Sequence, residues 1–273
     1  MSKVTFNLVG DIFTHLTGGN KGYSTAYKES KYLIWKNILS GNDNSAEITF
    51  YLEPWVKDVL TDKHSKKKYL WILESREVHK NCYDEITSNF EIYENLFDVI
   101  FTHDLELLSK SSKCKFVPAM GFWIKDIGIK SKSKLISMIS SNKNQTSGQK
   151  LRLDAIEKYK NRLDLFGRGF NPIKNKEEGL NDYMFSIVIE NSKYDSYFTE
   201  KILDCFVTGT IPVYWGTSDI GKFFNLDGII LYDDNFDISS LSLELYNSKM
   251  DAIKDNYNRA LNYEMAEDYI YLN

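Results

Sequence analysis

The sequence predicts an α/β protein built on parallel sheet, and three observations lead to this prediction. Short apolar, β-branched runs of strand length alternate along the chain with segments of helical periodicity. Residues 183–216 follow the order strand, loop, helix, strand, which is a βαβ unit and favours parallel strands. The polar residues of this stretch fall at the ends of its elements, where an open α/β sheet binds its ligands.

The βαβ unit is predicted from local patterns. Residues 184–189 are an unbroken apolar run of strand length, and residues 211–214 are a second one. Between them, Thr199 is expected to cap the N-terminus of a helix whose apolar residues recur at helical spacing. Gly209 is expected to end that helix.

The start of this helix is a candidate site for a phosphate-bearing ligand. A helix N-terminus attracts anions through its free N–H groups and its dipole, and Lys201 adds a full positive charge there. Glu190 and Glu200 would repel a bare phosphate, but either could accept hydrogen bonds from sugar hydroxyls.

The remaining elements are predicted from the same periodicities. In the first half we expect strands at residues 3–9, 47–52, 69–73 and 114–117, a further strand within 97–104, and helices at 32–39 and from 105. Residues 10–30 are expected to be a long loop, either on the surface or binding the acceptor. In the second half we expect strands at 135–140, 163–166 and 228–231, and helices at 148–159 and over most of 237–269.

Composition excludes several classes of protein. A chain of 273 residues with 26% charged and 42% hydrophobic residues is globular and long enough for about two domains. A net charge of −4 without a long basic block argues against nucleic acid as the main partner. Three cysteines and four histidines at irregular spacing form neither a disulfide framework nor a zinc motif. No run of 18 apolar residues and no signal peptide is present, so we expect no transmembrane segment.

The polar residues of the βαβ unit form a longer pattern. The spacing is Glu190-Asn191-Ser192, four residues, Tyr197-x-Thr199-Glu200-Lys201, and then Pro212-Val213-x-x-Gly216. This pattern resembles the signature of glycosyltransferase family 10, the α1,3/α1,4-fucosyltransferases. It is long, gapped and chemically unusual, and the alternative is an ordinary βαβ unit with capping polar residues. The resemblance is specific over about residues 135–231 and positional over the first 125.

The resemblance implies a GT-B-like fold, in which two Rossmann-like α/β domains face a cleft. The polar, lysine-rich segment 125–134 places the boundary near residue 127. Residues 1–127 would then form the N-terminal acceptor-binding domain. Residues 128–273 would form the C-terminal nucleotide-sugar donor-binding domain, together with the C-terminal helices.

The resemblance also implies a set of donor-binding residues. The family places an arginine after a Ser-Asn turn to hold the donor pyrophosphate, and Arg152 matches it. The alternative for Arg152 is a solvated helix arginine. Lys201 would neutralise the same diphosphate, Tyr197 would lie against the nucleotide, and Glu200 would bind ribose or sugar hydroxyls. Glu190 and Asn191 would line the fucose side of the site.

A glutamate is expected to be the catalytic base. Family members use a glutamate at the end of a strand of the N-terminal domain, and Glu74 matches that position after residues 69–73. The alternative is a surface glutamate at a helix N-terminus. Glu77 and His103 are the reserve candidates.

The resemblance therefore implies an inverting fucosyltransferase. L-fucose would pass from GDP-β-L-fucose to a hydroxyl of a glycan acceptor, in an α1,3-type linkage, without a metal and without a cofactor. No convincing DxD motif is present, which agrees with metal-free catalysis. The absence of an anchor suggests a soluble, cytoplasmic protein of the bacterial or viral type. Two alternatives stay open: a different nucleotide sugar, because Ile189 stands where the family has phenylalanine, and a non-catalytic glycan-binding protein on the same fold.

Overall fold

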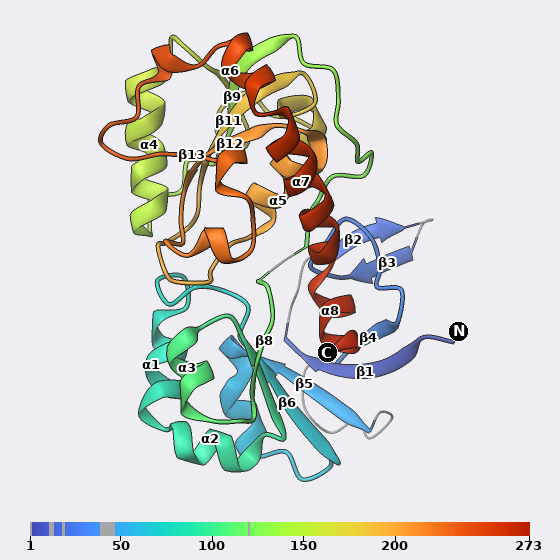
Figure 1. Cartoon of the computed structure of the whole chain (residues 1–273). Helices are drawn as coiled ribbons and strands as arrows, with labels where there is room; N and C mark the ends of the chain where they lie inside the picture. Colours follow the sequence, from blue (N-terminus) through green and yellow to red (C-terminus); the bar gives the residue numbers. More distant parts are fainter. Residues whose placement is uncertain (1, 11–13, 18–19, 39–46, 120) are drawn as a thin grey trace. The chain divides into compact units, whose positions relative to one another are not determined.

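The computed structural model describes the chain apart from residues 1, 11–13, 18–19, 39–46 and 120. The chain forms two compact units (Figure 1). The first comprises Met1–Gly121 together with Met265–Asn273, and the second comprises Phe122–Glu264. Among the described residues, no helix is both long and apolar enough to span a lipid bilayer.

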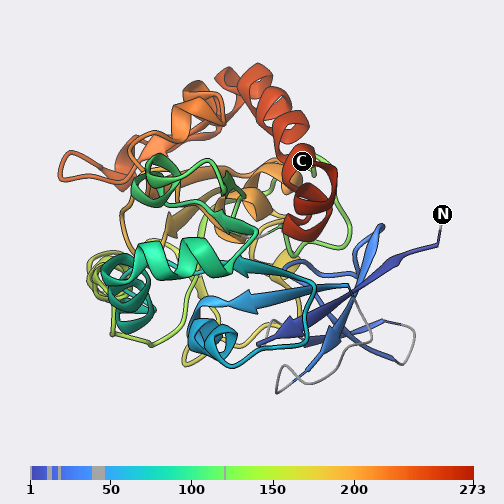
Figure 2. The same cartoon turned by 90° about the horizontal axis from the view of Figure 1, so that it is seen from below.

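The first unit contains a parallel sheet with the strand order β4-β1-β5-β6-β7-β8. Its strands are β1 (Val4–Val9), β4 (Leu33–Asn37), β5 (Ile48–Leu52), β6 (Lys67–Trp71), β7 (Val99–Thr102) and β8 (Cys114–Phe116). A separate antiparallel pair consists of β2 (Thr14–Thr17) and β3 (Asn20–Tyr23), within the segment predicted as a loop. The helices are η1 (Glu53–Leu60), α1 (Lys80–Ser88), α2 (Phe90–Leu96), α3 (Leu105–Lys110) and α8 (Ala266–Leu272). The strands fan apart in Figure 2, as in other twisted parallel sheets.

The helix predicted over residues 32–39 is wrong, because Leu33–Asn37 form the edge strand β4; residue 39 lies outside the described residues. Along β4 the side chains of Leu33 and Trp35 are buried, whereas Ile34 and Lys36 are exposed. This alternation has the period of a strand, and β4 pairs with β1 in parallel. In a segment of five residues, the sequence does not distinguish the period of a strand from that of a helix.

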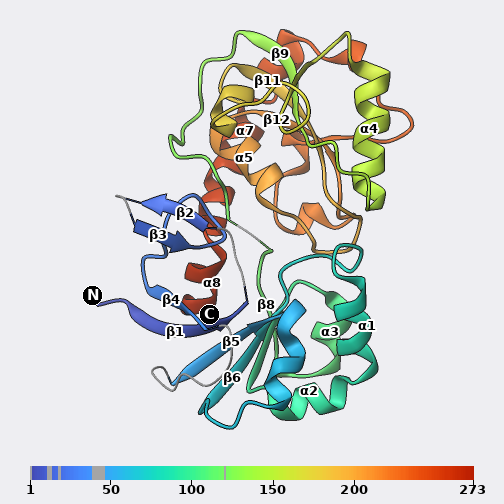
Figure 3. The same ribbon diagram turned by 180° about the vertical axis from the view of Figure 1, so that it is seen from behind.

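Each face of the first sheet has its own core, because neighbouring residues of a strand point to opposite sides. Phe50 lies in an aromatic cluster, with its ring 5.0 Å from that of Trp35. Tyr51, next in the chain, belongs to the other core, where it packs on Phe97 at 5.7 Å. In Figures 1 and 3, α1, α2 and α3 gather on one side of this sheet, and α8 lies beside β4.

The last helix, α8, returns to the first unit, whereas the predicted division assigned all C-terminal helices to the second domain. Its Glu267 is fully buried and accepts hydrogen bonds from the Thr25 N–H at 2.8 Å and the Thr25 hydroxyl at 2.5 Å. The next residue, Asp268, accepts a hydrogen bond from the Ser30 hydroxyl at 2.5 Å. These carboxylates find their partners in residues that are more than 230 positions away, so local sequence could not assign α8.

The second unit contains a parallel sheet with the order β10-β9-β11-β12-β13. Its strands are β9 (Lys134–Ile139), β10 (Asp164–Phe166), β11 (Tyr183–Ile189), β12 (Ile211–Trp215) and β13 (Ile230–Leu231). Its α-helices are α4 (Ser147–Tyr159), α5 (Glu200–Thr208), α6 (Leu243–Ser248) and α7 (Met250–Ala260). Short 3-10 helices occur at η2 (Lys176–Gly179), η3 (Ile220–Lys222), η4 (Leu226–Gly228), η5 (Ile238–Ser240) and η6 (Leu261–Tyr263). In Figures 1 and 3, α4 covers one face of this sheet and α5 with α7 the other.

The predicted βαβ unit is confirmed as β11, α5 and β12. Every residue of β11 is buried, as expected for a central strand that is covered on both faces. Thr199 caps α5 by accepting a hydrogen bond from the Lys201 N–H. Gly209 ends α5 in the left-handed conformation, with φ of 74°. The two α/β units confirm the predicted fold class.

We expect Glu267→Ala to lower the free energy of unfolding by about 1–3 kcal/mol, because it leaves the buried Thr25 donors without an acceptor. Urea unfolding measures this, and the exposed Glu91→Ala in the same unit is the control. Equal midpoints for the two variants would contradict the proposed anchoring of α8.

Candidate active site

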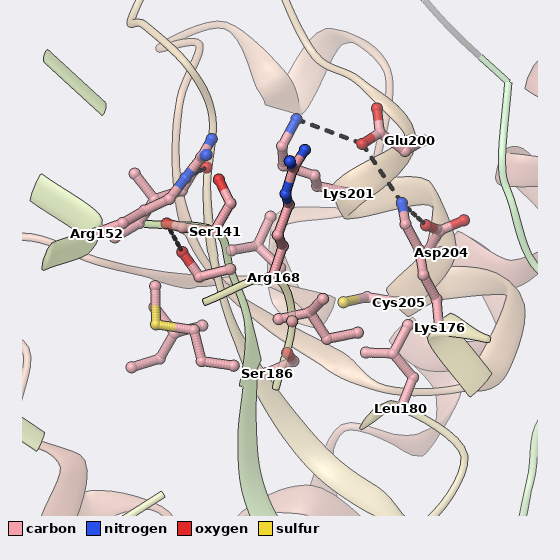
Figure 4. A pocket seen from close by; sticks show the side chains of 17 residues that line it. Ser141, Arg152, Arg168, Lys176, Leu180, Ser186, Glu200, Lys201, Asp204 and Cys205 are labelled. Atoms are coloured by element: carbon pink, nitrogen blue, oxygen red, sulfur yellow. Dashed lines mark hydrogen bonds and ion pairs between the residues drawn. The ribbon is translucent and has the colours of Figure 1, made fainter. Parts of the chain in front are cut away.

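The second unit contains a cavity of about 310 Å³ where β9 and β11 end and α5 begins (Figure 4). Its lining residues are Met138, Ile139, Ser140, Ser141, Arg152, Gly167, Arg168, Lys176, Leu180, Ser186, Ile187, Val188, Ile189, Glu200, Lys201, Asp204 and Cys205. We call it the charged cavity. Its place at the carboxyl ends of parallel strands is the ordinary location of a ligand site in an α/β sheet.

The charges around this cavity favour an anionic ligand. Four lining residues are cations, namely Arg152, Arg168, Lys176 and Lys201. Two are carboxylates, namely Glu200 and Asp204. Four positive charges less two negative charges leave a net charge of +2, which suits a diphosphate.

Arg152 reaches the cavity from α4 and is buried, so it is not a solvated helix arginine. Its Nε donates to the Ile189 carbonyl at 2.8 Å, and its Nη2 donates to Asn191 Oδ1 at 3.0 Å. The approach of α4 requires Gly148, because a Cβ there would lie 1.9 Å from the Glu190 carbonyl oxygen. Arg152 and Asn191, both predicted site residues, are thus joined at the end of β11.

Glu190 lies inside the protein and holds the start of α5. Its side chain is fully buried and is not among the residues that line the charged cavity. The carboxylate accepts hydrogen bonds from the Thr199 N–H at 2.9 Å and the Thr199 hydroxyl at 2.7 Å. It also lies 3.3 Å from Lys201 Nζ. Glu190 therefore fixes α5 and Lys201, whereas the sequence placed it on the sugar side of the site.

Glu200 and Lys201 line the cavity together, as the sequence predicted, but they belong to a larger ionic network. Glu200 Oε1 lies 3.5 Å from Lys201 Nζ and 3.4 Å from Lys176 Nζ. Lys176 in turn lies 2.7 Å from Asp204 Oδ2 (Figure 4). Burial acts to raise the pKa of Glu200, but Lys201 and Lys176 outweigh it and lower this pKa to about 2. Glu200 is therefore ionised at neutral pH.

Asp204 is the least stabilised carboxylate of this network. Burial raises its pKa to about 6, while Lys176 and the Trp123 N–H, which donates to Asp204 Oδ1 at 2.6 Å, oppose that rise. Lys176 and Asp204 were missed from the sequence. Lys176 lies in the polar segment before β11, and Asp204 lies in an otherwise apolar helix. The two residues are 28 positions apart, so local sequence does not indicate that they pair.

Tyr197 is fully buried and does not line the cavity. The residue before it, Ser196, has a left-handed backbone with φ of 60°, which is uncommon outside glycine. The Ser196 N–H donates to Asp219 Oδ1 at 2.7 Å, and the Ser196 hydroxyl donates to Asp219 Oδ2 at 2.9 Å. The loop that carries the donor signature is thus fastened to the loop after β12.

Glu74 belongs to the first unit and follows β6, which ends two residues earlier than the strand predicted at 69–73. Its N–H donates at 2.8 Å to Glu53, a buried carboxylate at the start of η1. Its carbonyl accepts a hydrogen bond from the Tyr83 hydroxyl at 3.0 Å and lies 3.3 Å from His103 Nε2. The backbone is thus fixed on both sides, and the half-buried side chain projects from a rigid position.

The reserve candidates for the base differ in their surroundings. His103 is buried, and burial lowers its pKa. Glu77 is exposed on the turn before α1. His79 is not among the predicted candidates, and its Nδ1 lies 3.1 Å from Glu53 Oε1. The hydrogen bond with Glu53 raises the pKa of His79.

No group of three or more His, Cys, Asp and Glu side chains is arranged to hold a metal ion in the part of the chain that the structure describes. The expectation of a reaction without metal stays a prediction.

We expect Asp219→Asn to destabilise the second unit by about 1–3 kcal/mol at pH 7, because the loop loses a charged acceptor. Burial acts to raise the pKa of Asp219, but hydrogen bonds from Thr217, Lys222 and Ser196 lower it from its ordinary 3.8 to about 2. A lowered pKa contributes stability above about pH 4, and this contribution is lost as the pH falls towards 2.

Urea unfolding at pH 7 and at pH 3 tests this expectation, with the exposed Asp234→Asn as the control. The difference between Asp219→Asn and the wild type should shrink at pH 3. A difference that is the same at both pH values would show that the charge of Asp219 does not hold the loop.

Comparison with known proteins gives the family. The sequence model for the C-terminal part of glycosyltransferase family 10 (fucosyltransferase) matches residues 129–269, which is more than half of the chain. The α-(1,3)-fucosyltransferase FucT of Helicobacter pylori is 35% identical over 108 residues, which cover 38% of this chain and 22% of that protein. The chain spans less than a third of the length of the curated relatives that it matches first.

Solved structures resemble the fold at low sequence identity. TarM has a TM-score of 0.55 at 12% identity, over 82% of this chain and 53% of that chain. An α-glucosyltransferase in complex with UDP has a TM-score of 0.54 at 12% identity, over 91% of this chain and 86% of that chain. These likenesses place the two α/β units in the GT-B fold class. The family model matches more than half of the chain, and the fold and the residues of the charged cavity agree with it. The chain therefore belongs to glycosyltransferase family 10.

Proposed function

We propose that the protein is an inverting fucosyltransferase that uses GDP-β-L-fucose and a glycan hydroxyl as acceptor, in an α1,3-type linkage. The observation that carries the proposal is the charged cavity, which combines a net charge of +2 with the residues Arg152, Glu200 and Lys201 of the family signature. A nucleoside diphosphate supplies both the negative charge and the ribose hydroxyls that such a cavity can bind.

In this proposal the reaction is a single displacement. The acceptor oxygen forms a bond to the anomeric carbon while the bond from that carbon to the diphosphate oxygen breaks. The leaving GDP takes the electron pair, and the acceptor proton passes to Glu74. Attack from the face opposite to the diphosphate inverts the anomeric configuration.

The side chains have distinct roles in this step. Lys201 and the N-terminus of α5 stabilise the negative charge that develops on the diphosphate, since fixed cations and N–H groups need no reorganisation during the reaction. Glu200, ionised at neutral pH, accepts hydrogen bonds from ribose hydroxyls. Arg152 keeps the end of β11 in place through the Ile189 carbonyl and adds positive charge beside it. No step requires a metal or a cofactor.

Thermal unfolding with GDP, GDP-fucose and UDP tests the donor class. A ligand at 100 times its dissociation constant should stabilise the protein by about 2.7 kcal/mol, which raises the melting temperature by several degrees. We expect a rise with GDP and GDP-fucose and none with UDP. A rise with UDP alone would support the alternative nucleotide sugar that Ile189 leaves open, and glycan binding without any nucleotide effect would support a non-catalytic protein.

We expect Glu74→Gln to lower turnover about 10²–10⁴-fold, because a positioned base contributes about that much to such reactions. This loss corresponds to about 3–5 kcal/mol of barrier. Binding of GDP should not change, since Glu74 lies in the first unit and the charged cavity in the second. Steady-state kinetics and GDP titration measure the two quantities, and Glu77→Gln is the control. Normal turnover in Glu74→Gln would show that another group takes the proton.

A further inference from the structure

A Gly-Arg-Gly turn after β10 is built against the end of β9. Gly167 and Gly169 both have left-handed backbones, with φ of 113° and 92°. A Cβ on Gly167 would lie 1.9 Å from the Ser140 carbonyl oxygen, and a Cβ on Gly169 would lie 2.7 Å from the Asn142 side chain. Both conformation and space therefore require glycine on each side of Arg168.

Backbone hydrogen bonds fasten this turn in place. The Ser140 N–H donates to the Phe166 carbonyl at 2.8 Å, and the Asn142 N–H donates to the Arg168 carbonyl at 3.2 Å. The Gly167 N–H donates to the Asn171 carbonyl at 2.7 Å. The position of Arg168 is thus fixed by the main chain on both sides, whereas its side chain is left exposed at the cavity.

Arg168 differs from the other cations of the charged cavity in its partners. Arg152 donates to Ile189 and Asn191, Lys176 pairs with Asp204, and Lys201 pairs with Glu190. Within the described residues, the Arg168 side chain has no hydrogen bond and no ion pair. In the view of Figure 4 it extends towards Lys201, which lines the same cavity.

We propose that Arg168 is a donor-binding residue that contacts the diphosphate of a nucleoside diphosphate in the charged cavity. This inference rests on the proposed function and adds a residue that lies outside the family signature at residues 190–216. The planar guanidinium can donate two parallel hydrogen bonds to phosphate oxygens. A guanidinium that is paired with a carboxylate would have to break that ion pair before it could bind a phosphate. Arg168 has no such ion pair within the described residues.

Isothermal titration of the full chain with GDP tests the proposal. We expect Arg168→Met to weaken GDP binding about 10- to 100-fold, which is the range for a lost hydrogen bond to a charged group. Binding of guanosine, which has no phosphate, should not change. Arg168→Lys should recover part of the affinity, because it restores the charge without the paired donors. The control is Arg162→Met, which removes an exposed arginine of the same unit that does not line the cavity.

The outcomes separate this inference from the proposed function. Equal GDP affinity in Arg168→Met and Arg162→Met would overturn the role of Arg168 while leaving the fucosyltransferase proposal intact. If the wild type binds UDP in place of GDP, the proposed donor is wrong, and the same variants titrated with UDP decide the role of Arg168. A wild type that binds neither diphosphate would overturn both. Urea unfolding midpoints equal to that of the wild type would show that the variants are folded.

Discussion

The candidate site depends on one interaction, in which the buried carboxylate of Glu190 accepts hydrogen bonds from Thr199, the residue that caps α5. A buried carboxylate is costly unless its oxygens are fully hydrogen bonded, and Thr199 and Lys201 supply that bonding here. The contact ties the end of β11 to the start of α5. On the opposite side of β11, the tight approach at Gly148 and the Arg152 contacts attach α4 to the same point. Two helices and two cations are therefore positioned by the last residue of one strand and the two residues that follow it.

This arrangement explains how the site can hold several cations before a ligand binds. Isolated like charges in a partly buried cavity repel each other, and each also loses its hydration. Glu190 and Glu200 balance Lys201, while Asp204 and Glu200 balance Lys176. The compensation preorganises the side chains, so that a ligand would meet donors that are already oriented. It is incomplete, because the net charge of the lining residues stays positive.

The parts of the structure that sequence could predict are those that local patterns determine. The strands β11 and β12 and the capped helix α5 follow from apolar runs, one N-cap and one glycine. The place of Glu200 and Lys201 at the start of α5 follows from the spacing of the signature, and Arg152 is assigned through the resemblance to the family; all three line one cavity. The orientation of Glu190 could not be predicted, since a polar residue after a strand can turn towards the ligand or back towards the next helix. The ionic partners of Lys176 and the docking of α8 could not be predicted either, because both depend on residues distant in sequence.

The same type of hydrogen bond recurs where a loop is held in place. A buried or largely buried carboxylate accepts a backbone N–H of a segment far away in sequence, as Glu53 does for the Glu74 backbone and Glu267 does for Thr25. Asp204 and Asp219 hold Trp123 and Ser196 in the same way. A carboxylate can accept several N–H hydrogen bonds at once. Because these bonds are charge-assisted, they offset more of the conformational entropy lost when a loop is ordered than bonds to a neutral acceptor would. Such anchors fix the main chain of the held residue, and Glu74 is held in this way. Glu74 and Glu53 differ in exposure: the side chain of Glu74 is half-buried, whereas the carboxylate of Glu53 is buried and accepts hydrogen bonds from the Leu73 and Glu74 N–H groups. A general base must be within reach of the acceptor hydroxyl, and the more exposed Glu74 meets this requirement better than the buried Glu53 does.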